Sequence, residues 1–437
     1  MLNRLLQSIC LLTIGLLVLV SCAGQSAADQ LTTTPALTET AAPGGNTPVV
    51  PLATPTPSGP MVLTIWIPEP LSPLNNRDAA TDIAQQITAF EASEPDILVE
   101  TRLKKVRDIG GIMETLRTAS AVAPGALPDL VLVRREDLLT AVQSGLIQPL
   151  DERTYTAHLA DFYPGVLELG KVNGQLYGLP YALDVSHLAY VGNSTGGNSD
   201  LQWQFSDILE NNQPFVFAAG RTSGLNDVFL IQYLAAGGVA MDGTIGSLNA
   251  NALRSTLTFY EQAVAAELLT PSLLDYTVST DFSDGLSNGT IPAAVINASQ
   301  YLVLRETLPN LQVAPVPTAS EGFTTLVDGW MWVMVTSNAD QQTASARFIN
   351  WMLDAERQGH FTEIVHLIPS QRDAVLRRWE ATPYAEFVNN LMDRAAIPLA
   401  GGGGVAARAM QTAFAAVLQG QRTADEATQD ALAQVGG

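Results

Sequence analysis

Strand-like and helix-like segments alternate from residue 61 onward, and this alternation constrains the fold more than any other feature of the chain. Apolar, β-branched strand patterns lie at 61–67, 96–103 and 127–133, and amphipathic helix patterns lie at 78–93, 111–121 and 136–145. Strands that are separated by helices pair in parallel, with helices covering both faces of the sheet. The first half of the chain is therefore expected to form an α/β unit.

A second alternating region follows a hairpin that is predicted around Asn173 and Gly174. Strand patterns occur at 214–220 and 292–297, helix patterns occur at 225–238 and 251–267, and the tail beyond 344 is mostly helical. A length of 437 residues is typical of two or three structural units. Because no proline-rich break separates the two α/β regions, we expect two lobes that share connections.

The residues before 61 carry targeting signals and are not expected to be part of the fold. Residues 1–21 combine a basic start at Arg4 with an apolar run, as in a secretory signal peptide. The run ends in Leu-Val-Ser-Cys at 19–22, which resembles the lipobox of bacterial lipoproteins. That resemblance implies a lipidated Cys22 and an anchor at the extracytoplasmic face of a membrane. An ordinary signal peptide with an incidental cysteine is the alternative.

The threonine- and proline-rich stretch at 22–60 is predicted to be a disordered tether, since it holds too little apolar surface to form a core. The chain has only two cysteines, Cys10 and Cys22, so cleavage before Cys22 would leave none for a disulfide or a cysteine-based metal site. The net charge of −21 makes nucleic acid an improbable partner.

Motifs of enzyme active sites are missing from the sequence. It contains no HExxH pair, no GxSxG elbow and no GxxxxGK[ST] loop, and the glycines at 401–404 do not follow a strand pattern. We therefore expect no enzymatic activity, no metal and no cofactor. Pairs of carboxylates that could hydrolyse a glycosidic bond leave a surface-tethered glycoside hydrolase as an alternative.

Three segments resemble family 1 extracellular solute-binding proteins, which are maltose-binding-protein-like components of ABC importers. The segments are "PDLVLVRREDLLTAVQSGLIQPLDE", "NGQLYGLPYALDVSHLAYV" and "SARFINWMLDAERQ" followed by "LIPSQRDA". The resemblance runs with gaps from about residue 62 to the C-terminus. It implies a type II periplasmic-binding-protein fold: two lobes, three interlobe crossings, and a ligand cleft that closes by hinge motion.

On this resemblance the crossings lie near 183–185, 311–315 and 353–356. Lobe one would hold 61–183 and 314–354, and lobe two would hold 186–311 and 356–437. The expected partners are a small-molecule solute, ABC permease subunits and, through the lipid anchor, the membrane. We expect the protein to act as a monomer that delivers a carbohydrate to its permease.

Candidate ligand-binding residues follow from the carboxyl ends of the predicted strands, where α/β folds bind ligands. Asp184 is the strongest candidate, because it lies at the first crossing and matches an acidic position in the family. The full set of candidates is Trp66, Glu69, Arg134, Arg135, Glu136, Tyr181, Asp184, Asn226, Asp227, Asn297, Ser299, Gln300, Tyr301 and Trp330. Aromatic rings would stack on sugar C–H groups, and carboxylates and amides would bind paired hydroxyls.

Several candidates also have a structural alternative. Trp66 fits a core position, and Arg134 and Arg135 fit the solvated end of a strand. If both arginines faced the cleft, an anion would become the expected solute, and a polyol or peptide also remains open. The family's Tyr-Asn-Lys after the crossing is replaced by Tyr-Val-Gly-Asn here, and aromatic residues make up only 7% of the chain. The sugar assignment therefore rests mainly on the resemblance.

Overall fold

The computed structural model describes residues 59–71, 76–150, 159–192, 203–221, 224–319, 322–379 and 382–436. The contacts divide the chain into two units, Met1–Thr56 and Pro57–Gly437, and the second unit is described here. The predicted signal peptide, the lipidation of Cys22 and nearly all of the predicted tether lie outside the described residues.

Within the described residues, a mixed sheet of nine strands forms the centre of the fold, and a two-stranded hairpin lies beside it. The sheet strands are β1 (Met61–Pro68), β2 (Ile97–Lys104), β3 (Leu130–Arg134), β6 (Gly178–Val191), β7 (Ala293–Asn297), β8 (Leu311–Ala314), β9 (Thr325–Met334), β10 (Ile368–Pro369) and β11 (Ala395–Ala396). The hairpin strands are β4 (Lys171–Val172) and β5 (Gln175–Leu176).

The three predicted strands of the first α/β region pair in parallel as expected, with β1 between β2 and β3. The sheet then continues with antiparallel pairs, because β9 returns between β3 and β6. The purely parallel sheet expected from the alternation is therefore wrong beyond β3. A strand from the distant segment Thr325–Met334 supplies the reversal, and local periodicity carries no information on such pairing.

Fifteen α-helices occur within the described residues. They are α1 (Arg77–Ser93), α2 (Ile112–Val122), α3 (Arg135–Gln143), α4 (Pro164–Leu167), α5 (Phe205–Glu210), α6 (Asp227–Ala235), α7 (Ala250–Ala265), α8 (Ser283–Ser287), α9 (Ala298–Leu304), α10 (Ala339–Met352), α11 (Ala355–Ile364), α12 (Arg372–Arg378), α13 (Pro383–Met392), α14 (Gly404–Leu418) and α15 (Ala424–Gly436).

Polar side chains define where the longer helices begin. The side chains of Asn76, Asn249 and Asn338 each accept hydrogen bonds from backbone N–H groups in the first turn of α1, α7 and α10. Thr382 caps α13 in the same way, ahead of Pro383 at the first helical position. Four glycines, Gly401–Gly404, lead into α14 with φ between 52° and 77°, a backbone region that suits glycine.

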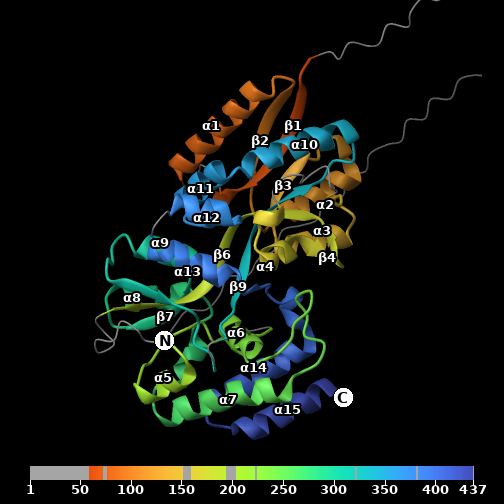
Figure 1. The fold of residues 1–437 in the computed structure, drawn as a ribbon. Helices are drawn as coiled ribbons and strands as arrows, with labels where there is room; N and C mark the ends of the chain where they lie inside the picture. The colour runs from red at the N-terminus through yellow and green to blue at the C-terminus, as the bar shows by residue number, and fades with distance from the viewer. Residues whose placement is uncertain are drawn as a thin grey trace, which may run out of the picture. The chain divides into compact units, whose positions relative to one another are not determined.

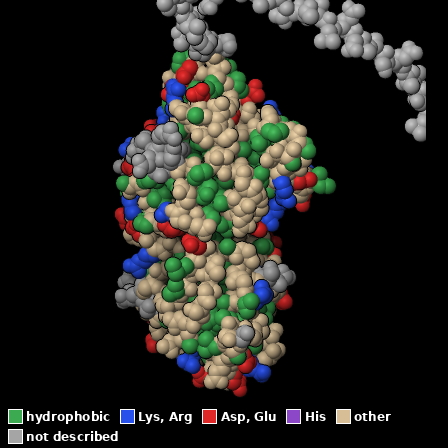
Figure 2. Space-filling model, turned by 90° about the vertical axis from the view of Figure 1, so that its right-hand side faces the viewer, with side chains coloured by type: hydrophobic (Ala, Val, Ile, Leu, Met, Phe, Trp, Pro, Cys, Tyr) green, Lys and Arg blue, Asp and Glu red, His purple; other side chains and the backbone are tan. Residues whose placement is uncertain are grey.

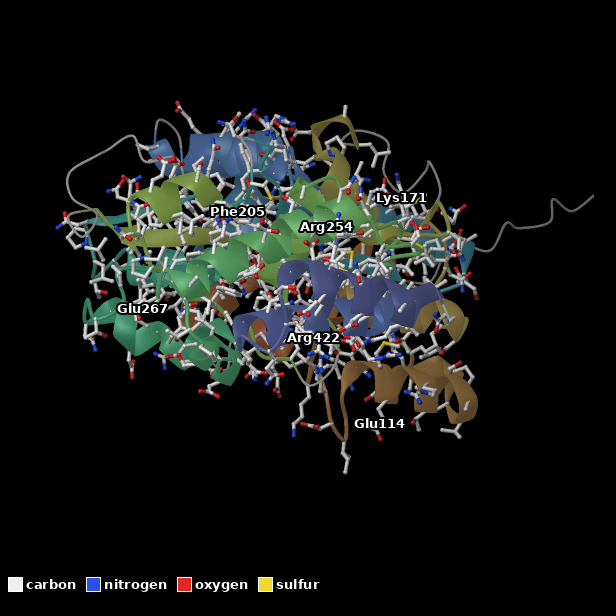
Figure 3. All side chains as sticks on the ribbon, turned by 90° about the horizontal axis from the view of Figure 1, so that it is seen from below. Glu114, Lys171, Phe205, Arg254, Glu267 and Arg422 are labelled. Atoms are coloured by element: carbon white, nitrogen blue, oxygen red, sulfur yellow. The ribbon has the colours of Figure 1, made fainter. Side chains whose placement is uncertain are left out.

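Two groups of helices pack on opposite ends of the sheet (Figure 1). Helices α1 and α10 lie beside β2 and β1, with α11 packed against α1, while α7, α14 and α15 lie together at the other end. Figure 3 looks onto this second group, where Arg254 of α7 bonds through Nε to the Asp425 carboxylate of α15 at 2.6 Å. Acidic and basic side chains are interspersed on the face in Figure 2.

The core divides into two clusters of buried side chains. The first is built around β1, β3, β6 and β9, and the second around α6, α7 and α14. Phe361 of α11 belongs to the first cluster, and β10 pairs with the first half of β6. The predicted division of the chain into lobes stays a prediction, and this packing favours a lobe one that extends past residue 356.

Two local predictions differ from the structure. Residues 214–220 form no strand and make only an isolated bridge between Val216 and Ala294. The segment after β7, expected to be a loop, is helix α9. The hairpin prediction is confirmed, since Asn173 and Gly174 connect β4 and β5 with φ of 52° and 78°.

Candidate functional site

Strand β6 changes its pairing partner at its midpoint, and polar side chains gather there. Up to Val185 it pairs with β9, and from Ser186 onward it pairs with β7. Asp184 lies directly opposite Asp328 of β9, while Ser186 lies opposite Asn297 at the end of β7. Directly paired residues of adjacent strands project to the same face of a sheet. Two carboxylates are therefore adjacent at the point where β6 passes from one set of strands to the other.

The carboxylate of Asp184 is held by hydrogen bonds from one neighbouring residue and from its own strand. Ser299 donates its backbone N–H to Oδ1 at 3.0 Å and its hydroxyl to Oδ2 at 2.6 Å. The N–H of Val185 donates to Oδ1 at 3.1 Å. Burial raises the pKa of Asp184 to about 6, although these hydrogen bonds and the charge of Arg134 act in the opposite direction. Such a buried carboxyl with strong partners is typical of a functional site.

Arg134 completes this part of the site from the end of β3. Its guanidinium forms an ion pair with Asp328 and lies 5.9 Å from the centre of the Trp330 ring. Both partners remain partly open to water. Asp328 also accepts the N–H of Gly329 at 2.8 Å. Arginine and carboxylate together offer donors and acceptors to a pair of neighbouring hydroxyl groups.

A third acidic residue, Asp227 of α6, interacts electrostatically with this cluster through Asp328. Half of the Asp227 side chain is exposed, yet burial is the main cause that raises its pKa, and the charge of Asp328 raises it further. Arg221 acts against this shift with an ion pair to Asp227 at 3.1 Å.

Asn226, another candidate, serves the fold at the start of α6. Its side chain accepts the N–H of Phe229 at 2.9 Å and donates to Gln411 of α14 at 3.0 Å. The residue is fully buried. The structure therefore gives Asn226 the role of a helix cap that joins α6 to α14.

The candidates that follow β7 lie close to Asp184 in the fold. Asn297 accepts the hydroxyl of Ser186 at 3.3 Å, and Ser299 donates to Asp184 as described. Gln300 donates to the carbonyl of Ser279 at 3.4 Å. Tyr301 is buried, and its ring packs 4.6 Å from that of Tyr384.

Other candidates are positioned differently from the prediction. Trp66 is 1% exposed and lies under the ammonium of Lys104, and Tyr181 is equally buried between Trp332 and Phe361. Neither ring presents an open face for stacking on a sugar. Both side chains belong to the first core cluster.

The two charged residues that follow Arg134 in the sequence bind groups outside the Asp184 cluster. Arg135 is buried and donates to the backbone carbonyls of Leu169 and Lys171. Glu136 is 71% exposed and pairs with Arg107 at 3.0 Å. Glu69 lies in a short 3₁₀ helix after β1.

Sequence reasoning missed Asp328 and Arg221. The signal for Asp328 was present, because it is the one charged residue in the otherwise apolar run of β9. A charge in the middle of a buried strand requires a partner and therefore indicates a functional or paired position. Arg221 follows a segment that was expected to be a strand, so its position gave no comparable signal.

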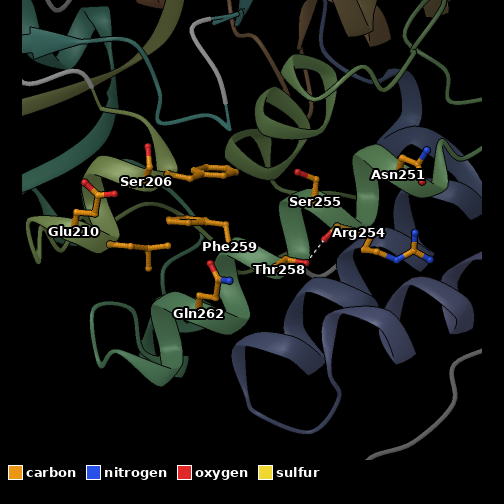
Figure 4. Close-up of a pocket in the computed structure, with 10 residues that line it drawn as sticks. Ser206, Glu210, Asn251, Arg254, Ser255, Thr258, Phe259 and Gln262 are labelled. Atoms are coloured by element: carbon orange, nitrogen blue, oxygen red, sulfur yellow. Dashed lines mark hydrogen bonds between the residues drawn. The ribbon is translucent and has the colours of Figure 1, made fainter.

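Among the described residues, three of the hollows lie away from the Asp184 cluster. One of about 550 Å³ lies between α5 and α7, where Ser206 and Glu210 face Phe259 and Gln262 (Figure 4). The other two, of about 670 and 400 Å³, flank the start of α11 and share Asp354 and Arg377. Among the described residues, no three His, Cys, Asp or Glu side chains are grouped to hold a metal ion. None of the described helices has the length and apolar character to cross a membrane.

Comparison with solved structures identifies the fold. The sugar-binding protein MalE from Xanthomonas citri is 18% identical, with a TM-score of 0.66, and the match covers 86% of this chain and 96% of that one. The maltose-binding periplasmic protein MalE from Listeria monocytogenes, in complex with maltose, is 14% identical, with a TM-score of 0.66 and coverage of 86% and 97%. An ABC transporter solute-binding protein from Thermotoga lettingae, bound with α-D-tagatose, is 18% identical, with a TM-score of 0.61 and coverage of 86% and 98%.

These structures confirm the predicted α/β fold of the two-lobed, maltose-binding-protein-like type. No curated protein matches the chain in sequence. Residues 85–386 match the family described as bacterial extracellular solute-binding protein. That match spans most of the described chain and includes β6, β9 and the Asp184 cluster. The chain therefore belongs to the bacterial extracellular solute-binding protein family.

Proposed function

We propose that the protein is an extracytoplasmic solute-binding lipoprotein of an ABC importer and that it binds a carbohydrate reversibly. Family membership supports solute binding, and the similar structures include proteins bound with maltose and with tagatose. The observation that carries the proposal is the cluster of Asp184, Asp328, Arg134 and Ser299 at the midpoint of β6. These groups offer several hydrogen-bond donors and acceptors within one small region.

Recognition would depend on hydroxyl groups that complete the hydrogen bonding of these side chains. Asp184 and Asp328 each have acceptor capacity beyond the bonds described, and Arg134 carries five N–H donors. Trp330 pairs with Arg134 across β3 and β9 and is 7% exposed, so we propose that only the edge of its indole borders this site. A solute that lacks a matching hydroxyl would leave buried polar groups unpaired, which costs about 1–3 kcal/mol for each group.

An anionic solute is disfavoured by the partners of the arginines. Arg134 is paired with Asp328, Arg135 donates to backbone carbonyls, and Arg221 is paired with Asp227. The nearby carboxylates would repel a second negative charge. This arrangement supports a neutral sugar in preference to a phosphorylated or acidic compound.

Closure of two lobes about the middle of β6 would trap the solute. Lobe one would comprise the elements around β1–β3, and lobe two the elements around α6, α7 and α14. The hydroxylated solute would bind from both sides, with Asp184 and Arg134 on one side and Asp227 on the other. Binding of this kind requires no bond making, so we propose no catalytic role for the carboxylates.

The lipid anchor is proposed from the sequence at 19–22. Cleavage before Cys22 and acylation of its thiol would hold the protein beside its permease, since two or more acyl chains anchor stably. Mass spectrometry of the membrane-bound protein would show an acylated N-terminal Cys22. Release of the Cys22→Ser variant into the soluble fraction would agree with this anchor, and unchanged membrane retention would contradict it.

Solute binding is tested with the unit Pro57–Gly437, which is separate from the N-terminal residues in its contacts. Thermal unfolding is followed in the presence of maltose, D-tagatose, glycerol, gluconate and phosphate, because a ligand that binds only the folded state stabilises it by RT ln(1 + [L]/Kd). We expect a sugar to raise the melting temperature and gluconate and phosphate to have no effect. Turnover of a sugar, or stabilisation by the anions alone, would overturn the proposal.

A further inference from the structure

We propose that His187 is a positioning residue for the solute site: it joins α13 to α9 and so holds Ser299 against Asp184. This inference rests on the proposed function, since it assigns a role to residues behind the same site. His187 lies three residues after Asp184 on β6 and projects to the opposite face of the strand. It is 0% exposed, which places it on the dry side of the site.

Three aromatic rings from two helices surround His187. The ring centre of Tyr301, on α9, is 5.4 Å from that of His187. The rings of Tyr384 and Phe387, on α13, lie at 6.0 and 5.5 Å. The imidazole is therefore the point where β6, α9 and α13 meet.

The hydrogen bonds of His187 define its tautomer. Nδ1 lies 3.1 Å from the carbonyl oxygen of Leu188, and because a carbonyl only accepts, Nδ1 carries the proton. Nε2 of the neutral ring is then an acceptor, and the hydroxyl of Tyr384 donates to it at 3.4 Å. This bond is directional and joins α13 to β6 through two buried side chains.

The same cluster continues to the solute site through α9. Tyr301 packs at 4.6 Å against Tyr384 and stands two residues after Ser299 on this short helix. Ser299 donates both its N–H and its hydroxyl to Asp184. A shift of α9 relative to β6 would therefore lengthen both hydrogen bonds to Asp184. Burial is the main cause that raises the pKa of Tyr384, and the nearby Tyr301 and Asp184 raise it further.

Charged and titratable groups around the cluster come from each element that packs on it. They are Asp184 on β6, Tyr301 on α9, Arg305 directly after α9, and Tyr384 on α13. The guanidinium of Arg305 lies 5.5 Å from the centre of the Tyr384 ring. Burial lowers the pKa of His187 to about 4, so the imidazole stays neutral at neutral pH and keeps Nε2 as an acceptor.

The test removes the hydroxyl of Tyr384 and measures Asp184 itself in the full chain. The pKa of Asp184 is followed by ¹³C NMR of aspartate-labelled protein, with its resonance assigned by its loss in Asp184→Asn. In Tyr384→Phe we expect the pKa of Asp184 to rise by about half a unit, because the Ser299 hydrogen bonds that lower it are weakened. Amide hydrogen exchange over residues 298–304 is expected to be about threefold faster.

Two further variants test whether the hydrogen bond from Tyr384 to His187 causes these changes. His187→Phe fills the space without an acceptor and is expected to behave like Tyr384→Phe. His187→Gln places an amide oxygen near the position of Nε2. We expect its Asp184 pKa and its amide exchange over residues 298–304 to be closer to the wild-type values than those of His187→Phe. This pair decides the question even if Tyr384→Phe fails to fold.

The matched control is Tyr163→Phe. Tyr163 is also buried and donates its hydroxyl to Asn389 of α13 at 3.0 Å, so its loss weakens the same helix without changing His187. We expect the control to leave Asp184 and residues 298–304 unchanged. The positioning role would be overturned if Tyr384→Phe kept the wild-type pKa of Asp184 and the wild-type amide exchange over 298–304. It would also be overturned if Tyr163→Phe shifted both quantities as much as Tyr384→Phe does. Neither readout needs a bound solute, so failure of every sugar to bind would instead contradict the proposed function.

Discussion

Asp184 and His187 are separated by two residues on β6, yet they occupy opposite kinds of environment. Asp184 faces a cluster that also contains Asp328 and Arg134, and Ser299 donates two hydrogen bonds to it. His187 faces only aromatic rings and one tyrosine hydroxyl. Since side chains alternate along a strand, one strand supplies a polar face and an apolar face at the same place.

The comparison shows that one physical cause shifts the two residues in opposite directions. Burial raises the pKa of Asp184 to about 6 and lowers that of His187 to about 4, since it disfavours the charged form of each. The polar partners of Asp184 limit its shift and leave it able to bind a hydroxylated solute. His187 has no charged partner among the described residues in contact with it, so it supports the fold as a neutral group.

The largest expected effect is the loss of folding stability that His187 causes when the pH falls. Its pKa in the folded state lies below the ordinary value of 6.5, so on acidification the unfolded chain takes up a proton first. The wild type should lose about 3 kcal/mol of stability from this group as the pH falls from 6.5 to 4. In His187→Gln this loss should be absent, as measured by urea unfolding across that range. Identical pH profiles for the two proteins would contradict the assigned burial.

Whereas His187 lowers stability in acid, the substitution Asp184→Asn should raise stability at neutral pH. The folded-state pKa of Asp184 is raised, so its carboxylate reduces stability progressively as the pH rises from 3.8 to 6. The neutral amide should therefore increase stability at pH 7 by about 1–3 kcal/mol, while affinity for the sugar falls about 30-fold. Urea unfolding and calorimetric titration with the sugar that stabilises the wild type measure the two effects. A variant that binds as well as wild type would remove Asp184 from the site.

Much of the first α/β region could be predicted from the sequence. Strands β1, β2 and β3 and helices α1 and α2 lie within a few residues of their predicted bounds, because each has a clear hydrophobic period. Residues 214–220 share the composition of a strand but find only one bridging partner. Pairing is a tertiary property, and composition alone does not specify it.

The candidate site was only partly accessible to the same reasoning. Asp184 could be selected as a candidate because it lies at the predicted first crossing and matches an acidic position of the family, and its role in binding stays a prediction. Trp66 and Tyr181 could not be placed, since a buried ring and a sugar-stacking ring occur in similar local sequences. His187 was not selected at all, because its role depends on Tyr384, which lies 197 residues later.

Asp328→Asn is expected to have an intermediate effect. The substitution keeps the shape of the side chain but removes the partner charge of Arg134 and the acid opposite Asp184. Sugar affinity should fall about tenfold, which is 1.4 kcal/mol. The pKa of Asp227 should also decrease, because the charge of Asp328 raises it in the wild type. An unchanged affinity together with a lower Asp227 pKa would show that Asp328 acts only through the electrostatic field.

Glu136→Gln should have the smallest effect of these substitutions. It tests whether a negative charge near Arg134 is enough for sugar binding or whether the carboxylate must also be buried. Glu136 follows Arg134 by two residues and carries the same charge as Asp184, but its side chain is 71% exposed and pairs with Arg107 in water. Exposed ion pairs contribute little, so stability should change by less than about 0.5 kcal/mol. Sugar affinity should stay within about twofold of wild type, since the Arg107 pair binds the carboxylate elsewhere. A tenfold loss of affinity would return Glu136 to the site and would mean that an exposed carboxylate near Arg134 contributes to binding as the buried one does. Burial of the carboxylate would then not be what distinguishes Asp184 as a candidate for sugar binding.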